Sequence, residues 1–197
     1  MDAVSTRREF MVKAGAAGAV LAGVAAVTAQ AETQKTEGKA IMENSVKKII
    51  VAADPFAVTL KDAVVAHLKE KGYEVTDLGS TKEKPQPYFE CAVTACKAMQ
   101  AGQAERAFLF CGTGMGMSIV ANRFKGVTAS VVESVFAAKM SRAINNANVL
   151  CMGQMIWGEW MAKEAADVFL NTGFTQGMEP FSGFLHEACG KVEAIRP

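Results

Sequence analysis

A turn with three glycines at alternate positions carries the residues best suited to chemistry. Residues 110–118 read Phe-Cys-Gly-Thr-Gly-Met-Gly-Met-Ser, where an apolar strand-like run passes into a helical pattern. Glycines at these positions let the backbone turn tightly and direct several N–H groups at one point, and the positive end of the helix dipole adds to them. We therefore predict an anion-binding cradle with the thiol of Cys111 on its rim and the hydroxyl of Thr113 inside it.

The glycine turn differs from the two common nucleotide-binding loops. No Gly-Lys-Ser/Thr follows it, as a Walker loop requires, and it comes after the third predicted strand, whereas a dinucleotide fingerprint follows the first. The spacing also leaves open a purely structural role, because turns between a strand and a helix often need glycine for packing. Taken alone, the glycine spacing is weak evidence for a reactive site.

Alternating strand and helix patterns must position this turn. Short apolar runs with β-branched or aromatic residues predict strands, and longer segments with apolar residues three and four positions apart predict helices. The predicted strands are residues 48–53, 73–78, 106–111, 127–132 and 148–153. The predicted helices are residues 60–71, 88–100, 115–124, 135–145, 157–170 and 181–195. This order predicts an α/β fold, a three-layer αβα Rossmann-like domain with a doubly wound, five-stranded parallel sheet.

Such a sheet also predicts where a ligand binds. Ligands of doubly wound sheets lie beyond the carboxyl ends of the strands. In this chain the rule indicates three places: Asp54 after the first predicted strand, the turn at residues 111–116 after the third, and the stretch around Gly153 after the fifth.

The glycine turn is the first of two motifs that occur together in this chain. Residues 110–123 read Phe-Cys-Gly-Thr-Gly-Met-Gly-Met-Ser-Ile-Val-Ala-Asn-Arg, and residues 145–150 read Asn-Asn-Ala-Asn-Val-Leu. The pair resembles the family of ribose-5-phosphate isomerase B and galactose-6-phosphate isomerase, over residues 47–195. The resemblance implies a Rossmann-like fold and aldose–ketose isomerisation through a cis-enediolate. It also implies a homodimer, or a higher homo-oligomer, with active sites at the subunit interface.

The resemblance gives the site residues their roles. Cys111 is the base that removes the carbon-bound proton, Thr113 and backbone N–H groups stabilise the enediolate, and Asp54 moves a hydroxyl proton. A helix N-terminus suits this base, because it favours the thiolate form of a cysteine. The backbone N–H groups belong to Gly112, Gly114 and Gly116. The predicted substrate-binding residues are Ser118, Asn122, Arg142 and Asn145, although a simple surface charge on a helix is an open alternative for Arg142.

Several positions depart from the family pattern. Pro55 and Ile144 stand where the family has histidines, the second of which is associated with ring opening. Met178 and Glu179 stand where arginines usually follow Gly177. Arginine is the favoured bidentate partner of phosphate, so the phosphate-binding half of the site is not recognisable. We therefore expect a substrate other than ribose 5-phosphate, either an unphosphorylated sugar or a sugar with a different charge.

A non-catalytic protein on the same fold is the alternative interpretation. The loss of two histidines is compatible with a periplasmic protein that uses the cradle to hold a sugar or a small anion. Retention of Cys111 and Thr113 favours catalysis, because binding alone does not need a thiol on the rim. We therefore expect an aldose–ketose isomerase that acts on a small carbohydrate.

The first 31 residues have the pattern of a removable export signal. Arg7 and Arg8 precede a weakly apolar run at residues 14–27, and Ala-Gln-Ala at residues 29–31 forms an A-x-A cleavage site. The arginine pair followed by Phe10 resembles a twin-arginine signal, whose substrates are exported already folded. We predict a signal at residues 1–31, a flexible linker at residues 32–46 and a periplasmic domain at residues 47–197 without stable membrane insertion.

The composition excludes several other functions. The 197 residues include 21 basic and 20 acidic side chains, a balance that gives no reason to expect nucleic acid as a partner. Five cysteines without CxxC or Cys/His ligand spacing indicate neither a metal site nor a disulfide framework. We expect no cofactor and no metal, and we expect Cys91, Cys96, Cys151 and Cys189 to be small buried hydrophobes.

Overall fold

The computed structural model describes residues 46–81 and 83–195, which belong to one compact unit, Asn44–Pro197. The export signal predicted at residues 1–31, and all but the end of the predicted linker, lie outside the described residues. Within the described part of the chain, no helix is long and apolar enough to cross a membrane.

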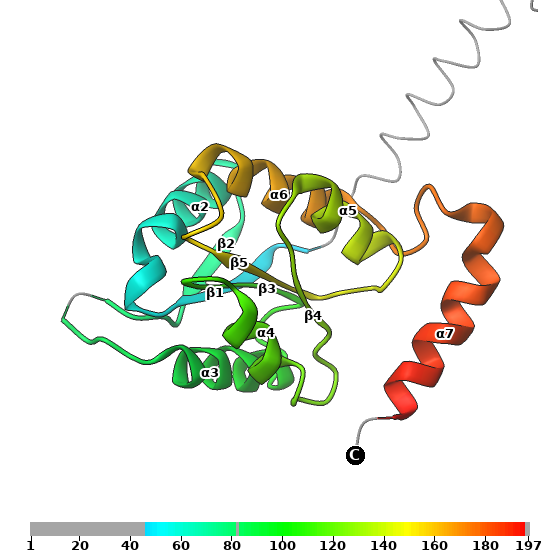
Figure 1. The fold of residues 1–197 in the computed structure, drawn as a ribbon, viewed down its shortest axis with the longest axis horizontal. Coiled ribbons are helices and arrows are strands. Elements are labelled where there is room, and N and C mark those ends of the chain that lie inside the picture. Colours follow the sequence, from blue (N-terminus) through cyan, green and yellow to red (C-terminus); the bar gives the residue numbers. More distant parts are fainter. Residues whose placement is uncertain (1–45, 82, 196–197) are drawn as a thin grey trace, which may run out of the picture. The chain divides into compact units, whose positions relative to one another are not determined.

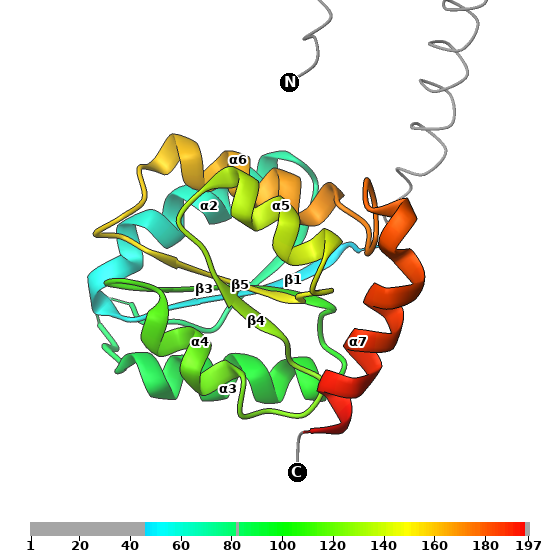
Figure 2. The same cartoon turned by 45° about the vertical axis from the view of Figure 1, so that its right-hand side comes forward.

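Five parallel strands form a sheet in the order β2-β1-β3-β5-β4. The strands are β1 (Lys48–Ala53), β2 (Glu74–Asp77), β3 (Arg106–Cys111), β4 (Ala129–Val131) and β5 (Val149–Gly153). The α-helices are α2 (Val58–Glu70), α3 (Tyr88–Gln100), α4 (Met115–Ala121), α5 (Val135–Ala143), α6 (Glu159–Asn171) and α7 (Ser182–Ala194), with short 3-10 turns η2 (Pro55–Ala57) and η3 (Glu179–Phe181). Helices α2, α5 and α6 cover one face of the sheet and α3 and α4 the other (Figures 1 and 2). The predicted fold class is therefore confirmed.

The strand order reverses between β1 and β3, and this reversal positions the site. The chain leaves β1 towards α2 on one face of the sheet and leaves β3 towards α4 on the other. Ala53 lies opposite Phe110, and Cys111 lies opposite Gly153. The N–H of Asp54 donates to the carbonyl of Phe110 at 3.1 Å. Asp54 and the glycine turn thus lie side by side at the switch point, where sheets of this kind bind ligands.

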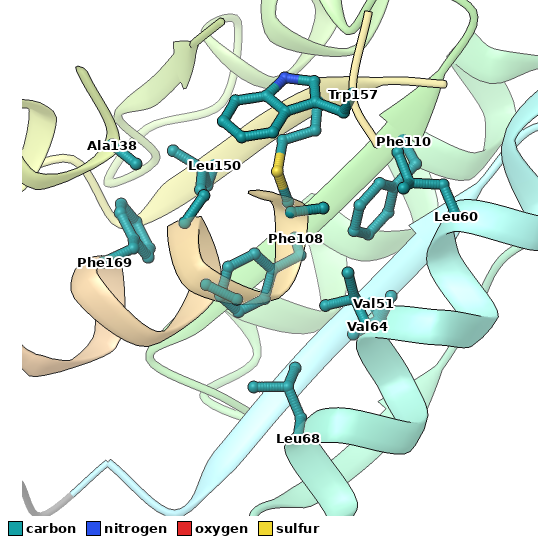
Figure 3. Packing of buried hydrophobic residues seen from close by; sticks show 14 of the residues in the cluster. Val51, Leu60, Val64, Leu68, Phe108, Phe110, Ala138, Leu150, Trp157 and Phe169 are labelled. Atoms are coloured by element: carbon teal, nitrogen blue, oxygen red, sulfur yellow. The ribbon is translucent and has the colours of Figure 1, made fainter. Parts of the chain in front are cut away.

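Large side chains form the core under α2, α5 and α6. Phe108 on β3 and Phe169 on α6 meet edge to face with ring centroids 5.6 Å apart, a geometry that adds to the apolar area they bury. Trp157 is 4% exposed and belongs to the same cluster (Figure 3). Its indole N–H donates to the carbonyl of Val132 at 2.9 Å. This packing holds β5 and the start of α6 firmly beside the strand that ends at Cys111.

Small side chains form the core on the opposite face, under α3 and α4. This cluster consists largely of alanines and cysteines, so the two helices approach the sheet closely. Cys91, Cys96 and Cys151 are fully buried in it, as predicted. The prediction for Cys189 was wrong: this thiol is partly exposed, because α7 buries only Leu185.

The limits of two helices differ from the prediction for local reasons. Helix α4 ends at Ala121, three residues early, because the Asn122 side chain bonds to the backbone of the next strand and Gly126 turns the chain with a φ of 77°. The C-terminal helix starts as η3, which contains Pro180, and continues as α7 from Ser182. Proline fits the first turn of a helix because its missing N–H has no partner there.

Candidate active site

The glycine turn joins β3 to α4 and is fixed by close contacts with β5. Gly114 has a φ of 80°, and a Cβ on it would come within 3.0–3.2 Å of backbone atoms of Cys151 and Met152. A Cβ on Gly153 would lie 2.5 Å from the Thr113 Cα. At Gly114 the packing and the positive φ both exclude a side chain. This position therefore needs glycine for structural reasons, which is the role that the sequence had left open.

At the other two glycines of the turn, an added Cβ would make different contacts. A Cβ on Gly116 would lie 2.7 Å from the Tyr88 ring, which packs over the first turn of α4. A Cβ on Gly112 would meet only the Met155 sulfur, at 3.3 Å. Gly116 therefore makes room for an aromatic side chain, and Gly112 is the least constrained of the three.

The thiol of Cys111 lies in this turn, at the end of β3. The N–H of Gly114 donates to its Sγ at 3.1 Å, and the residue is 6% exposed. Thr113 Oγ1 accepts from the N–H of Met115 at 3.4 Å. The hydrogen bond from Gly114 fixes the position of the Cys111 sulfur at the start of the turn. The turn therefore holds a potential base beside a hydroxyl and the amino end of a helix.

Asp54 adds a carboxyl group next to the turn. It is 8% exposed, and its Oδ1 accepts from the N–H of Phe56 at 3.0 Å. Burial raises the pKa of the Asp54 carboxyl, and the N–H groups of Phe56 and Ala57 partly oppose that rise. A carboxyl with a raised pKa exchanges a proton more readily near neutral pH, as a group that moves hydroxyl protons must.

Two of the predicted substrate-binding residues, Ser118 and Asn122, use their side chains for hydrogen bonds within helix α4 and the loop after it. Ser118 is 8% exposed, and its hydroxyl donates to the carbonyl of Met115 at 3.3 Å. The Asn122 amide donates to the carbonyls of Ser118 and Ala129 and accepts from the N–H of Ala129, at 2.8–3.0 Å. Asn122 thereby holds the start of β4, and the structure does not place its amide beside Cys111.

Arg142 lies at the opposite end of the sheet, where β5 begins. It is 4% exposed, and its guanidinium donates to the carbonyls of Thr172 and Ala147 and to the Asn146 side chain. Burial lowers the pKa of Arg142 to about 10, with a smaller contribution from Arg106. The open alternative of a surface charge is wrong, because the side chain is buried, and within one copy the guanidinium lies at the other end of the sheet from the turn. Arg142 instead fastens α5 to the start of β5 and the end of α6.

Asn145 is exposed at the same far end, so the length of β5 separates it from Cys111. It lines a hollow of about 230 Å³ between α7 and the body of the protein, together with Ile144 and Phe184. One copy of the chain therefore brings Cys111, Thr113 and Asp54 together but leaves Asn145 apart from them.

Exposed apolar side chains follow several of the strands whose carboxyl ends lie at the same edge of the sheet as the turn. Phe56, Phe136 and Trp160 follow the carboxyl ends of strands and are 71–80% exposed, and Met155 is 78% exposed. Exposed apolar patches of this extent mark interaction surfaces. The signal in the sequence was large apolar residues immediately after strands, where polar residues are usual. Elsewhere in the described chain, no group of three His, Cys, Asp or Glu side chains is placed to hold a metal ion.

The family model described as ribose/galactose isomerase matches residues 49–180, which is well over half of the chain. The chain belongs to the ribose/galactose isomerase family. The fold and the strand-end positions of Cys111 and Asp54 agree with this membership, because the match begins in β1 and includes every strand.

Comparison with individual relatives indicates which class of reaction the chain catalyses. The chain is 48% identical over 150 residues to 4-deoxy-4-sulfo-D-erythrose isomerase of Clostridium sp. strain MSTE9, over 75% of this chain and 94% of the relative. It is 37% identical over 131 residues to ribose-5-phosphate isomerase B of Escherichia coli K12, over 66% and 88% of the two chains. The solved structure of ribose-5-phosphate isomerase B from Clostridium thermocellum matches with a TM-score of 0.68 at 32% identity, over 75% and 96%. Since these relatives are sugar isomerases, the chain is an enzyme of the same class.

The structure shows where the residues that depart from the family pattern lie. Pro55 begins η2 directly after Asp54, and Ile144 lies beside the hollow under α7. Glu179 turns back so that its Oε1 accepts from the N–H of Gly177 at 2.8 Å. A hydrophobic side chain and a carboxylate therefore occupy two places where the family pattern has cationic or titratable groups.

Proposed function

We propose that the enzyme interconverts an aldose and a ketose through a cis-enediolate, with Cys111 as the base. The observation that carries the proposal is the 3.1 Å hydrogen bond from the Gly114 N–H to the Cys111 Sγ, in a turn whose backbone cannot relax. The thiolate removes the proton from the carbon next to the carbonyl, and the resulting thiol returns it to the neighbouring carbon. No net oxidation occurs, because the carbonyl and the carbinol exchange places.

Charge develops on the substrate oxygens during this transfer. The Thr113 hydroxyl and the N–H groups of Gly112 and Gly116 are the donors proposed to stabilise it, and preorganised donors of this kind contribute roughly 3–4 kcal/mol each to lowering a barrier. Asp54 is proposed to carry the hydroxyl proton from one oxygen to the other, supported by its burial and its raised pKa.

We also propose that the site is completed by a second copy of the chain. Two observations support it: Asn145 lies at the far end of the sheet from Cys111, and exposed apolar side chains occur both around the turn and on α7. On α7 these are Phe184, Val192 and the adjoining Ile195. A two-fold dimer would bring the α7 end of one copy to the turn of the other, and both surfaces would be covered.

Mixing two inactive variants tests the shared site. Cys111→Ala and Asn145→Ala should each lose activity as homodimers. After dissociation and reassociation in equal amounts, one site in each heterodimer is intact, so about a quarter of the wild-type activity should return. A mixture that stays inactive although heterodimers have formed would show that the two residues do not share a site.

The substrate is proposed to be an open-chain sugar with four carbons and a sulfonate end. A four-carbon aldose closes a five-membered ring only through its C4 hydroxyl, and a C4 sulfonate removes that hydroxyl. An enzyme for such a substrate needs no ring-opening group, which agrees with Pro55 and Ile144 at the two histidine positions. The relative with 48% identity acts on a sugar of this kind.

The α6–α7 loop also favours a sulfonate over a phosphate. A phosphate group carries about two negative charges at neutral pH and a sulfonate one, so the carboxylate of Glu179 disfavours phosphate more. The hydroxyls of Ser182 and Thr175 lie 3.4 Å apart in this loop, and the His186 ring stacks on Phe174 with centroids 4.7 Å apart. These groups are proposed as the donors to the charged end of the substrate.

The decisive experiment measures isomerisation and solvent exchange over a panel of sugars. Purified protein is assayed in heavy water with 4-deoxy-4-sulfo-D-erythrose, D-erythrose 4-phosphate, ribose 5-phosphate and neutral pentoses. We expect deuterium at the carbon next to the carbonyl for the sulfonate, and a loss of at least about a thousandfold in Cys111→Ala. Turnover of ribose 5-phosphate at the highest rate would refute the substrate assignment, and unchanged exchange in Cys111→Ala would refute the base.

We further propose that the enzyme is exported in folded form to the periplasm. The support is the Arg7-Arg8 pair, the apolar run and the A-x-A site in the sequence. A folded export route also suits this domain, since its four buried or nearly buried thiols lie in the core and must stay reduced while it folds.

A further inference from the structure

A second hollow, of about 940 Å³, lies at the end of the sheet opposite to Cys111. The strands β1 and β3 begin in it, at Lys48 and Arg106, and the loops after α3 and α4 form its other walls. Each strand has six residues, so roughly 20 Å of β-structure separates the hollow from the catalytic turn. Its size falls within the range of small-molecule sites, and within one copy it lies apart from the turn that carries Cys111.

The side chains that line this hollow carry an excess of positive charge. Lys47, Lys48, Arg106 and Lys125 line it, and the lining contains one carboxylate, Glu105. The excess of three charges contrasts with the whole chain, whose net charge is +1. The cations come from three separate segments, residues 47–48, 106 and 125. A concave surface of one sign attracts ligands of the opposite charge.

The wall that carries Lys125 is held in place by hydrogen bonds. The side chain of Gln100 at the end of α3 donates to the carbonyl of Lys125 at 3.0 Å. The Asn148 amide donates to the carbonyl of Gly126 at 2.7 Å and accepts from the N–H of Thr128 at 2.8 Å. Preorganisation of this kind lowers the entropic cost of binding.

Arg106 is the least solvated cation of the hollow. Burial lowers the pKa of its guanidinium, and Glu105 partly opposes that shift. Its Nη1 donates to the carbonyl of Glu105 at 3.0 Å, and within the described residues it has no carboxylate within ion-pair distance. Buried cations are normally paired, because desolvation without a counter-charge is costly. Arg106 thus adds to the lining of the hollow a half-buried cation that forms no ion pair with a carboxylate of the described residues.

We propose that this hollow binds a small polyanion with two or more linked phosphate groups. Four cations from three segments match a ligand whose charge is spread over more than one group, because a single phosphate has too few oxygens to bind them all. Arginine and lysine are the usual partners of phosphate, the former through bidentate hydrogen bonds and the latter as a point charge. Within one copy the hollow lies at the other end of the sheet from Cys111, and its test uses a probe that is not a sugar, so the test does not depend on the identity of the substrate.

Isothermal titration of the full chain with inorganic pyrophosphate tests the site. We expect one pyrophosphate per chain, and binding weakened about tenfold or more in Lys125→Glu and in Arg106→Gln. Lys139→Glu is the matched control, because Lys139 is exposed on α5, which does not line the hollow. Melting temperatures of all variants show whether they fold like the wild type.

Titrations with ADP and orthophosphate, together with the control variant, distinguish the possible ligands and define the results that would contradict the proposal. Tighter binding of ADP than of pyrophosphate would assign the site to a nucleotide, and equal binding would assign it to the linked phosphates alone. Orthophosphate should bind at least about tenfold more weakly than pyrophosphate. Absence of binding, equal affinity for orthophosphate, or the same weakening in Lys139→Glu would each overturn the proposal.

Discussion

Alanine at Gly114 and at Gly112 should have very different effects, although the two glycines are two residues apart in one turn. At Gly114 the left-handed backbone costs a non-glycine residue about 1–2 kcal/mol. The new Cβ also meets three backbone atoms at 3.0–3.2 Å, and overpacking against such rigid neighbours costs about 1–3 kcal/mol more. We therefore expect Gly114→Ala to lower the free energy of unfolding by about 2–5 kcal/mol, or roughly 5–15 °C in melting temperature.

At Gly112 neither cost applies. Its φ is not positive, and the Cβ meets only the tip of Met155, a side chain that is 78% exposed and free to move. Gly112→Ala should stay within about 1 kcal/mol of the wild type. Urea denaturation measures both variants, and deuterium exchange should fall at least about tenfold in Gly114→Ala alone, because its N–H leaves Cys111. Equal destabilisation by the two substitutions would refute the account of the turn.

Three further predictions concern other parts of the chain. Arg142→Met should lower the free energy of unfolding in urea by about 3 kcal/mol, by leaving buried carbonyls unpaired, with KM unchanged. Because burial raises the pKa of Asp54, its ionised form opposes folding as pH rises above the usual value of 3.8. Asp54→Asn should therefore stabilise the protein more at pH 7 than at pH 3, measured by urea midpoints. Replacing Arg7 and Arg8 by lysine should leave unprocessed protein in the cytoplasm, detected by cell fractionation.

The sequence predicted the elements of the fold better than their arrangement. Strands buried on both faces appear as apolar runs such as residues 48–53 and 106–111, so their number and order along the chain are readable. The spatial order of the strands is not, because the placement of β5 between β3 and β4 depends on packing between segments distant in sequence. The early end of α4 likewise depends on a hydrogen bond from Asn122 to Ala129, which no helical periodicity reports.

The residues of the candidate site also differ in how much of their placement can be read from the sequence. Asp54, Cys111 and Thr113 were found because they follow strands, and a parallel sheet brings the ends of its strands to one edge. Asn122 and Arg142 were placed with the substrate because of the resemblance to the isomerase family. Their partners are backbone carbonyls, of Ala129 for the one and of Thr172 and Ala147 for the other. A sequence pattern does not reveal that a polar side chain is already satisfied by the backbone of another segment.

Packing also explains why the reaction and the substrate need not change together. Side chains at Gly114 and Gly153 would collide with backbone at 2.5–3.2 Å, so the turn that carries Cys111 tolerates little variation. At the other end of the sheet, Glu179 is exposed, and its carboxylate accepts a hydrogen bond from the backbone N–H of Gly177. The loop that carries Glu179 can therefore exchange arginines for other residues without disturbing the core. Under the proposed function, the enzyme keeps its proton-transfer chemistry while a loop on the surface sets the charge of its substrate.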